Sequence, residues 1–343
     1  MRLCLRLYKP TRGVLGSRPM PALQIGYHDH CFDGVASAAT FLRFYRDKLK
    51  PGLTDVGLRG LAHRAGHLFD ADVFSGEENA VVDFRFSPDP RLTWWFDHHQ
   101  SAFESADDEA VFRADRSGRK FWDPQAKSCT RFLARIAEEK FGWDPSPLRE
   151  LIDWAEIIDG ALFPTPEMAV ALGEPPMQLM LLIEASKDPA VLPRLIRELS
   201  QRPLSTVLRE PWVTGPLQPL LERHHELVRL VTARIRLDRG VATYDLADLD
   251  VDNVNKFIAY AADASTLYTV SVSRGPNRSK ISLGSNPWKQ QLRRHNLARI
   301  AERYGGGGHP AVAAISLPPD RLQEARAAAA TIADELRQPT SSS

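Results

Sequence analysis

Three short apolar segments in the first third of the chain each carry aspartate or histidine at or just beyond their ends. Residues 23–27 lead into His28-Asp29-His30-Cys31-Phe32-Asp33-Gly34, residues 80–84 contain Asp83, and residues 92–96 lead into Asp97-His98-His99. Apolar runs of this length are typical of buried parallel strands, whose carboxyl ends lie at one edge of a sheet. We therefore predict an α/β domain with a parallel sheet and a functional site at its carboxyl edge.

The remaining patterns predict a second, smaller domain. Helical spacing occurs at 35–50, 128–141, 148–159, 167–186 and 189–201, and a proline-rich passage precedes a long helix at 220–236. Strands at 240–244, 266–273, 280–283 and 312–317 then alternate with helices at 254–262, 289–304 and 321–336. We expect a flexible extension (1–22), a catalytic domain (23–203), a helical linker (204–236), an α+β substrate-binding domain (237–337) and a disordered tail (338–343).

Composition indicates the cellular compartment of the protein. No stretch of the 343 residues approaches the roughly 20 apolar residues that a membrane helix needs. The three cysteines, Cys4, Cys31 and Cys129, are widely scattered, which is typical of a reducing compartment, so we expect a cytoplasmic protein. The basic start of the chain lacks the apolar core of a targeting peptide, and Met20 is an alternative start. The sequence leaves the oligomeric state open, a homodimer included.

The residue types at the predicted sheet edge favour metal chemistry. Carboxylates mixed with imidazoles suit Mn²⁺ or a similar ion better than a structural thiolate zinc site, and two such ions can clamp a displacement at phosphorus. A further acid, Asp159, ends the predicted helix at 148–159 beside Gly160. Between residues 271 and 304 the chain carries eight basic residues, Arg274 and Arg278 among them, against the single acid Glu302. Such a cationic surface suits a polyanion.

Two of these motifs resemble those of one known family. Asp97-His98-His99, preceded by Asp83 and by the loop ending in Asp33-Gly34, resembles the DHH phosphoesterase superfamily. The segment 304–314, with Gly305, Gly306, Gly307, Gly308 and His309, is similar to the signature of the DHH-associated substrate-binding domain. The resemblance spans about residues 23–336. The superfamily includes RecJ-type exonucleases, oligoribonucleases, nucleoside bisphosphate phosphatases, cyclic-dinucleotide phosphodiesterases and some polyphosphatases.

The resemblance implies a centre of two Mn²⁺ ions, with Mg²⁺ or Co²⁺ as alternatives. Asp83 would bridge the ions, His28 would bind the first, and Asp33, His98 and Asp159 would bind the second. Asp97 and His99 would orient ligands or the attacking water. Many members have an aspartate where this chain has Cys31, which leaves Cys31, Asp29 and water as candidates for the last position on the first ion.

The second domain is expected to hold the rest of the substrate. Backbone amides of Gly305–Gly308, together with His309, Arg274 and Arg278, would contact phosphate oxygens. We therefore predict a metal-dependent phosphoesterase acting on short single-stranded oligonucleotides or nucleotides. The alternatives are an exopolyphosphatase or pyrophosphatase, and a degenerate nucleotide-binding module without catalysis. His224 and His225 are expected on a solvated helix face.

Overall fold

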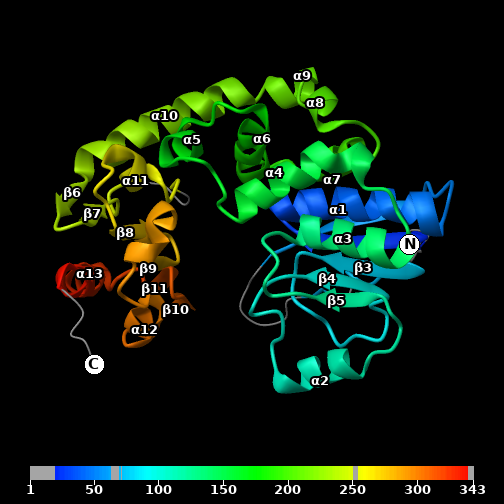
Figure 1. Cartoon of the computed structure of the whole chain (residues 1–343), viewed down its shortest axis with the longest axis horizontal. Coiled ribbons are helices and arrows are strands. Elements are labelled where there is room, and N and C mark those ends of the chain that lie inside the picture. Colours follow the sequence, from blue (N-terminus) through cyan, green and yellow to red (C-terminus); the bar gives the residue numbers. More distant parts are fainter. Residues whose placement is uncertain (1–19, 63–68, 71, 250–253, 339–343) are drawn as a thin grey trace, which may run out of the picture.

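The computed structural model describes residues 20–62, 69–70, 72–249 and 254–338. Two lobes lie side by side and are bridged by a long helix, α10 (Leu217–Arg234) (Figure 1). The N-terminal lobe contains a parallel sheet and the C-terminal lobe a mixed sheet, which confirms the predicted fold class. Most of the expected extension and tail lies outside the described residues. No helix in the described part of the chain has the length and apolar character that crossing a membrane requires.

The first sheet has five parallel strands in the order β2-β1-β3-β4-β5. Its strands are β1 (Leu23–His28), β2 (Val56–Leu61), β3 (Glu78–Val82), β4 (Trp94–Asp97) and β5 (Lys120–Trp122). The three predicted strands are therefore direct neighbours in the sheet, as the expected convergence of their carboxyl ends requires. The two edge strands, β2 and β5, were not predicted.

Helices cover one face of this sheet and aromatic side chains fill the other. The largest apolar cluster joins the sheet to α1 (Phe32–Phe44), α3 (Cys129–Phe141), α4 (Arg149–Asp159) and α7 (Val191–Leu199). A π-helical turn, Tyr45–Leu49, extends α1. On the opposite face Phe84, Phe86 and Trp95 pack with Phe112 of α2 (Ala106–Ala114) (Figure 1).

Two predicted helices are broken in the structure. The segment 167–186 forms α5 (Pro166–Ala171) and α6 (Pro175–Ala185), because Leu172 adopts a left-handed conformation (φ 49°) and two prolines begin α6. The segment 289–304 forms a 3₁₀ helix, Pro287–Leu292, and α12 (Leu297–Glu302). Between them, the amides of Arg294 and His295 donate to the Tyr268 hydroxyl, at 2.7 and 3.1 Å, instead of to helix carbonyls. The proline-rich passage contains α8 (Leu204–Val207) and α9 (Pro211–Thr214).

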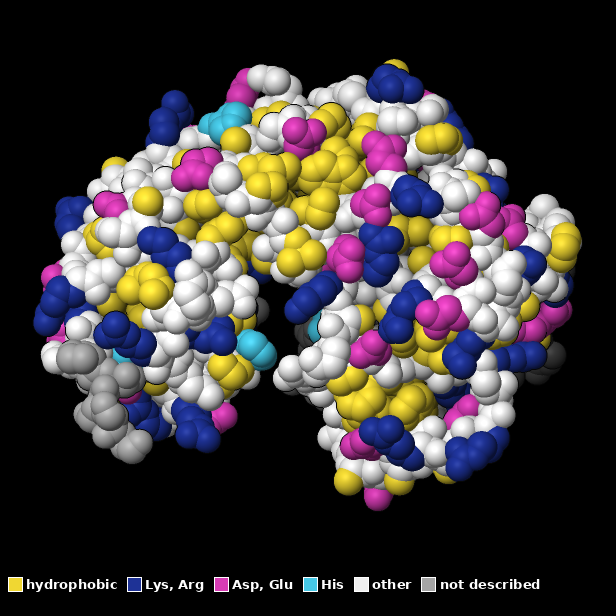
Figure 2. Space-filling model, viewed as in Figure 1, with side chains coloured by type: hydrophobic (Ala, Val, Ile, Leu, Met, Phe, Trp, Pro, Cys, Tyr) yellow, Lys and Arg dark blue, Asp and Glu magenta, His cyan; other side chains and the backbone are white. Residues whose placement is uncertain are grey.

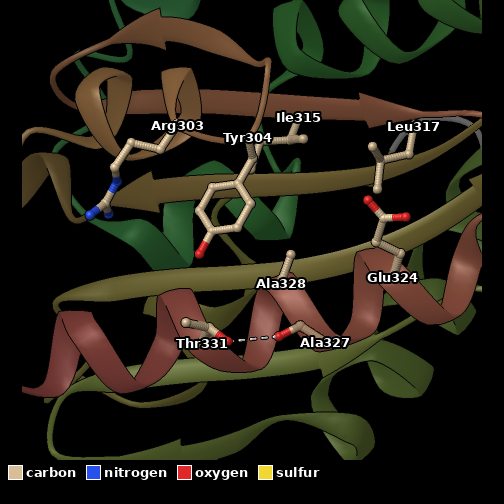
Figure 3. Close-up of a pocket in the computed structure, with 8 residues that line it drawn as sticks. All are labelled: Arg303, Tyr304, Ile315, Leu317, Glu324, Ala327, Ala328 and Thr331. Carbon is tan, nitrogen blue, oxygen red and sulfur yellow. Dashed lines mark hydrogen bonds between the residues drawn. The ribbon is translucent and has the colours of Figure 1, made fainter.

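The C-terminal lobe is built on six strands in the order β10-β11-β9-β8-β7-β6. These are β6 (Arg236–Asp238), β7 (Val241–Asp245), β8 (Tyr268–Gly275), β9 (Arg278–Ser285), β10 (Gly307–His309) and β11 (Val312–Leu317). The short helix α11 is Ile258–Ala262, and α12 and α13 (Leu322–Arg337) contribute to the core of the lobe. A pocket of about 410 Å³ lies between α13 and β11, where Ile315, Leu317 and Ala328 provide apolar lining (Figure 3).

A buried apolar cluster joins the two lobes. Phe163, from the connection that follows α4, packs against Phe257 with ring centroids 5.9 Å apart, and Trp288 Nε1 donates to the Phe163 carbonyl at 2.7 Å. The ring of His224 on α10 is buried rather than solvated, and its Nε2 lies 2.7 Å from the Val170 carbonyl. Apolar packing therefore holds the lobes together in addition to the linker helix.

Candidate metal centre and cleft

The turn from β1 into α1 places two of the predicted side chains next to each other. A Cβ atom on Gly34 would lie 2.1 Å from the carbonyl oxygen of His28, so only glycine fits at this position. The first turn of α1 consequently packs directly on the backbone of His28, the last residue of β1. This contact holds Asp33, in the first turn of α1, beside the carboxyl end of β1.

Asp83 lies at the middle of the site. It follows β3 in a left-handed conformation (φ 56°), its amide donates to the Phe96 carbonyl at 2.9 Å, and it is 1% exposed. Its Oδ2 is 3.4 Å from Nδ1 of His28 and its Oδ1 is 3.4 Å from Nε2 of His98. Burial raises the pKa of Asp83, but the interactions with His28 and His98 outweigh burial and hold that pKa at about 2. Asp83 is therefore a carboxylate shared by the ends of β1 and β4.

His98 faces three carboxylates at once. Its Nδ1 lies 3.1 Å from the Ala126 carbonyl, which can only accept, so Nδ1 carries a proton and Nε2 points into the site. Nε2 is 3.3 Å from Asp159 Oδ2, 3.4 Å from Asp83 Oδ1 and 3.7 Å from Asp33 Oδ2. Burial lowers the pKa of His98, but the surrounding carboxylates outweigh burial and raise it to about 10.

Asp97 organises the turn that carries both histidines. Its Oδ1 accepts hydrogen bonds from the amides of His98 (2.8 Å) and His99 (3.3 Å), and it lies 2.7 Å from Nδ1 of His99. Asp97 is fully buried, so this carboxylate positions the two rings and is not itself open to substrate. Burial lowers the pKa of His99, but the Asp97 carboxylate raises it to about 9.

Asp33 has two roles in the local structure. Its carboxylate accepts hydrogen bonds from the amides of Cys129 (2.6 Å) and Thr130 (3.1 Å), at the start of α3, and it also faces His98. Burial, together with the charges of Asp83 and Asp159, raises the pKa of Asp33 well above its usual range. Burial and the charge of Asp83 also raise the pKa of Asp159, to about 6. Three carboxylates that repel one another in a buried space would be stabilised by a cation.

The donor atoms form overlapping groups of the kind that holds a metal ion. Three overlapping groups have their ligand atoms within 4.8 Å of one another: His28, Cys31 and Asp83; Asp83, His98 and His99; Asp33, His98 and Asp159. Asp83 Oδ1 and His98 Nε2 are buried and form no well-aligned hydrogen bond with any described residue. Ligand bonds of about 2.0–2.2 Å hold neighbouring ligand atoms roughly 3 Å apart, so small shifts would bring these atoms onto an ion. All five predicted ligands are thus brought together, and Asp83 belongs to two of the three groups.

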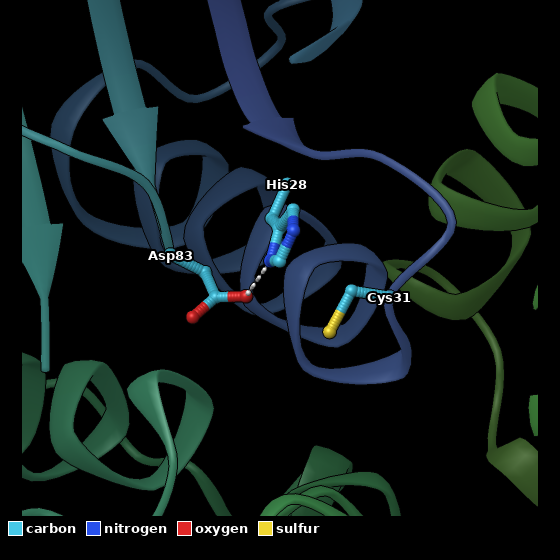
Figure 4. A group of neighbouring side chains, drawn as sticks. All are labelled: His28, Cys31 and Asp83. Carbon is cyan, nitrogen blue, oxygen red and sulfur yellow. Dashed lines mark ion pairs between the residues drawn. The ribbon is translucent and has the colours of Figure 1, made fainter. Parts of the chain in front are cut away.

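The structure brings Cys31, but not Asp29, to the first of these groups. The Cys31 side chain extends from the start of α1 near the His28–Asp83 pair (Figure 4). Although Cys31 is the N-cap of α1, its side chain makes no capping hydrogen bond. Asp29 lies against β2 instead, with its Cγ only 2.4 Å from where a Cβ of Gly60 would be, and it pairs with His30 at 3.5 Å. Burial and the charge of Asp83 raise the pKa of the Cys31 thiol.

The glycine run is tightly packed, and local contacts explain why three of its four positions are glycine. Gly305 (φ 74°) and Gly306 donate to the carbonyls of Glu302 and Ala301, at 3.1 and 2.9 Å, and end α12 in a Schellman motif. A Cβ on Gly306 or on Gly308 would lie within 2.5 Å of a carbonyl oxygen of β11. A Cβ on Gly307 would meet no atom of a described residue within 4 Å.

Arg274 and Arg278 do not join this hairpin. The hairpin end of β11, Val312, pairs with Gly284, whereas Arg278 begins β9 six residues earlier, a distance of about 20 Å along the strand. Arg274 pairs with Ser279 beside Arg278, so both arginines lie at the opposite end of these strands from the hairpin, and their contact with the substrate stays a prediction. His309 is exposed at the hairpin, and its Nδ1 accepts a hydrogen bond from the Ala311 amide at 3.2 Å. In the neutral ring, Nε2 is then the protonated nitrogen and can donate to a ligand.

The two lobes face each other across a hollow (Figure 2). Histidine side chains are visible on both walls of the hollow, and lysine and arginine side chains gather around it. On the N-terminal side, the end of α4 carries Asp159, and Ile157 and Ile158 pack against the apolar cluster that joins the lobes. The metal-ligand candidates therefore lie close to the C-terminal lobe.

DHH-domain proteins are among the solved structures that this arrangement of two lobes resembles. The pGpG-specific phosphodiesterase PggH of Vibrio cholerae superimposes with a TM-score of 0.61 at 16% sequence identity, covering 92% of this chain and 99% of that chain. The DHH domain of a protein described as belonging to a family of ribosomal proteins gives 0.60 at 13% identity, covering 93% and 88%.

A third structure with this fold is RecJ of Thermus thermophilus in complex with Mn²⁺. It gives a TM-score of 0.50 at 14% identity, covering 93% of this chain and 53% of RecJ. No family model and no curated protein sequence matches the chain. At these identities the comparison shows the fold, and the chain has the DHH fold over nearly its whole length.

Proposed function

We propose that the chain is a divalent-metal-dependent phosphoesterase that hydrolyses phosphate esters of short oligonucleotides or nucleotides. The observation that supports this most strongly is the position of Asp83, a buried carboxylate shared by two groups of ligand atoms at the carboxyl ends of adjacent strands. A surface acid or a helix cap would not need two imidazoles and two further carboxylates within reach. A buried excess of negative charge that must face a phosphate requires a bound cation.

Each residue of the centre has a separate task. Asp83 lies between the two cation positions, His28 and Cys31 belong to the first, and Asp33, His98 and Asp159 belong to the second. Two divalent ions held there would supply the Lewis acidity that activates water and offsets charge on the phosphate oxygens. Asp97 holds the backbone and ring of His99, which would contact the substrate or the attacking water. Asp33 is held by the two amides of α3, which fix its orientation.

In this proposal the substrate is a short oligonucleotide that spans the hollow. The match to the pGpG phosphodiesterase over 99% of that chain indicates that both proteins contain the two lobes, so a dinucleotide-sized ligand is our first choice. The scissile phosphate would lie at the metal centre. The Nε2 proton of His309, at the end of the hairpin that contains Gly307, would bind a second part of the substrate from the opposite wall. Manganese is the favoured ion because a set of carboxylates mixed with imidazoles suits it better than a thiolate zinc site, and the cytoplasm is the favoured compartment because the cysteines are few and scattered.

A substrate panel tests the proposal. Purified protein is stripped of metal, reloaded with Mn²⁺, and incubated with 5′-phosphorylated dinucleotides, longer single strands, nucleoside 3′,5′-bisphosphate, cyclic dinucleotides and polyphosphate. We expect the fastest metal-dependent turnover with the dinucleotides. Faster release of phosphate from polyphosphate would favour the exopolyphosphatase alternative. Tight binding of nucleotides without turnover of any substrate would favour the degenerate binding module.

Gly307→Ala tests the role of the hairpin. Because an added Cβ at Gly307 meets no described atom, the variant should fold with an unchanged melting temperature. If the backbone at Gly307 approaches a substrate phosphate closely, the methyl group would obstruct the contact, and KM should rise about tenfold with kcat and metal content nearly unchanged. Gly173→Ala is the matched control, since its Cβ also meets nothing within 4 Å and it lies in the N-terminal lobe. Equal KM values for both variants would remove Gly307 from the binding site.

Cys31→Ser and Cys31→Asp test the first cation position. If the Cys31 sulfur binds the ion, Cys31→Ser should weaken Co²⁺ and Zn²⁺ binding by about tenfold or more, and Cys31→Asp should shift the preference towards Mn²⁺. Cobalt-loaded wild-type protein should also show a sulfur-to-cobalt charge-transfer band that both variants lack. Unchanged metal affinities and an absorption spectrum without that band in the wild type would leave water as the better candidate ligand.

A further inference from the structure

The backbone around Lys256 crosses from one lobe to the other. Lys256 precedes α11, and its two neighbours contact residues 163 and 169, which belong to the apolar cluster that joins the lobes. Asn255 Nδ2 donates to the Ala169 carbonyl at 2.8 Å, and the Phe257 ring packs on Phe163, four residues beyond Asp159. Lys256 is thus held beside the end of α4, although it is nearly 100 residues away in the sequence.

The ammonium group of Lys256 is available for a ligand. The residue is exposed, its Nζ lies 5.1 Å from the Phe257 ring centroid, and it forms no ion pair with any described residue. Its charge nevertheless acts electrostatically on the carboxylates of Asp159 and Glu184. Glu184 lies near the end of α6. Lys256 is therefore a cation contributed by the C-terminal lobe at the edge of the acidic centre.

We propose that Lys256 is a positioning residue whose ammonium group binds a phosphate oxygen of the substrate at the edge of the metal centre. This inference rests on the proposed function for its substrate class, and it names a residue that lies outside both sequence motifs. An ammonium is a compact point charge on a flexible stem, which suits an oxygen whose position varies between substrates. The contacts of Asn255 and Phe257 hold this backbone on the cluster that joins the lobes, which gives Lys256 a fixed place near the segment that follows α4.

Three variants and two measurements test this. Lys256→Met removes the charge at nearly constant length, Lys256→Arg retains it, and Lys48→Met is the control, because Lys48 is exposed at the far end of α1. The first measurement is KM and kcat for a 5′-phosphorylated dinucleotide with Mn²⁺. The second is the affinity for adenosine monophosphate of protein loaded with Ca²⁺, which needs no turnover and stays informative even if the proposed activity fails. Metal content and melting temperature are recorded for each variant.

We expect Lys256→Met to raise KM and to weaken nucleotide binding by about tenfold or more, the usual effect of losing a hydrogen bond to a charged group. Its metal content and melting temperature should equal those of wild type, while Lys256→Arg and Lys48→Met should stay within about threefold of wild type in both measurements. Nucleotide affinity that is unchanged in Lys256→Met would overturn the inference. A second result would also overturn it. If Lys256→Met loses bound metal but, once saturated with metal, binds the nucleotide as tightly as wild type, Lys256 acts only on Asp159 and Glu184.

Discussion

Asp83→Asn is expected to reduce turnover by about a thousandfold or more while the protein remains folded. Asparagine has the same shape as aspartate and tolerates the left-handed conformation that Asp83 adopts (φ 56°), so the backbone after β3 should be preserved. The substitution removes the negative charge that two groups of ligand atoms share. We therefore expect both cation positions to lose affinity together, which metal analysis after dialysis and calorimetric titration with Mn²⁺ would detect.

The control for this prediction is Asp107→Asn. Asp107 is an exposed acid on α2, on the opposite side of the sheet from α1, and its substitution should leave activity and metal content unchanged. Circular dichroism would check that both variants retain the wild-type helix and strand content. Turnover of Asp83→Asn within tenfold of wild type, or loss of one ion with full retention of the other, would contradict the shared position of this carboxylate.

Much of the centre was predictable because parallel strands bring their carboxyl ends to one edge. The segments 23–27, 80–84 and 92–96 are predominantly apolar, and in the structure they are adjacent strands, which explains why His28, Asp83 and His98 meet. Strand β2 was missed because Gly57, Arg59 and Gly60 disrupt its apolar pattern. At Gly60 the structure gives the reason, since the Asp29 side chain occupies the space that a Cβ would need.

Other features depend on contacts between distant segments. The predicted helix at 289–304 is interrupted because the Tyr268 hydroxyl accepts hydrogen bonds from the amides of Arg294 and His295. Helix propensity depends on the local sequence and does not reflect such a distant contact. Gly173 and the prolines that begin α6 are signals of the break at Leu172, so the prediction of one continuous helix over 167–186 is wrong. Lys256 belongs to no motif, and its place beside Asp159 follows only from the packing of Phe257 on Phe163.

Gly34→Ala is expected to affect both stability and activity. The new Cβ would lie 2.1 Å from the carbonyl oxygen of His28 and 2.8 Å from its Cβ, so either α1 or the end of β1 must move by about an ångström. Overpacking of this kind typically costs about 1–3 kcal/mol of unfolding free energy. His28 and Asp33 lie on opposite sides of the contact, so the movement separates ligands of the two cation positions. A displacement of this size at an active site can reduce turnover by about a hundredfold.

Chemical denaturation and steady-state kinetics on Gly34→Ala, with Gly173→Ala as control, measure these two effects separately. The control introduces the same methyl group where it meets nothing within 4 Å, so it reports the general effect of replacing a glycine. If excess Mn²⁺ restores the activity of Gly34→Ala, the loss arises from weakened ion binding. If it does not, the loss arises from misplaced ligands around bound ions. A variant that is as stable and as active as the control would contradict the close packing of α1 on His28, and with it the reason for an Asp-Gly pair at this turn.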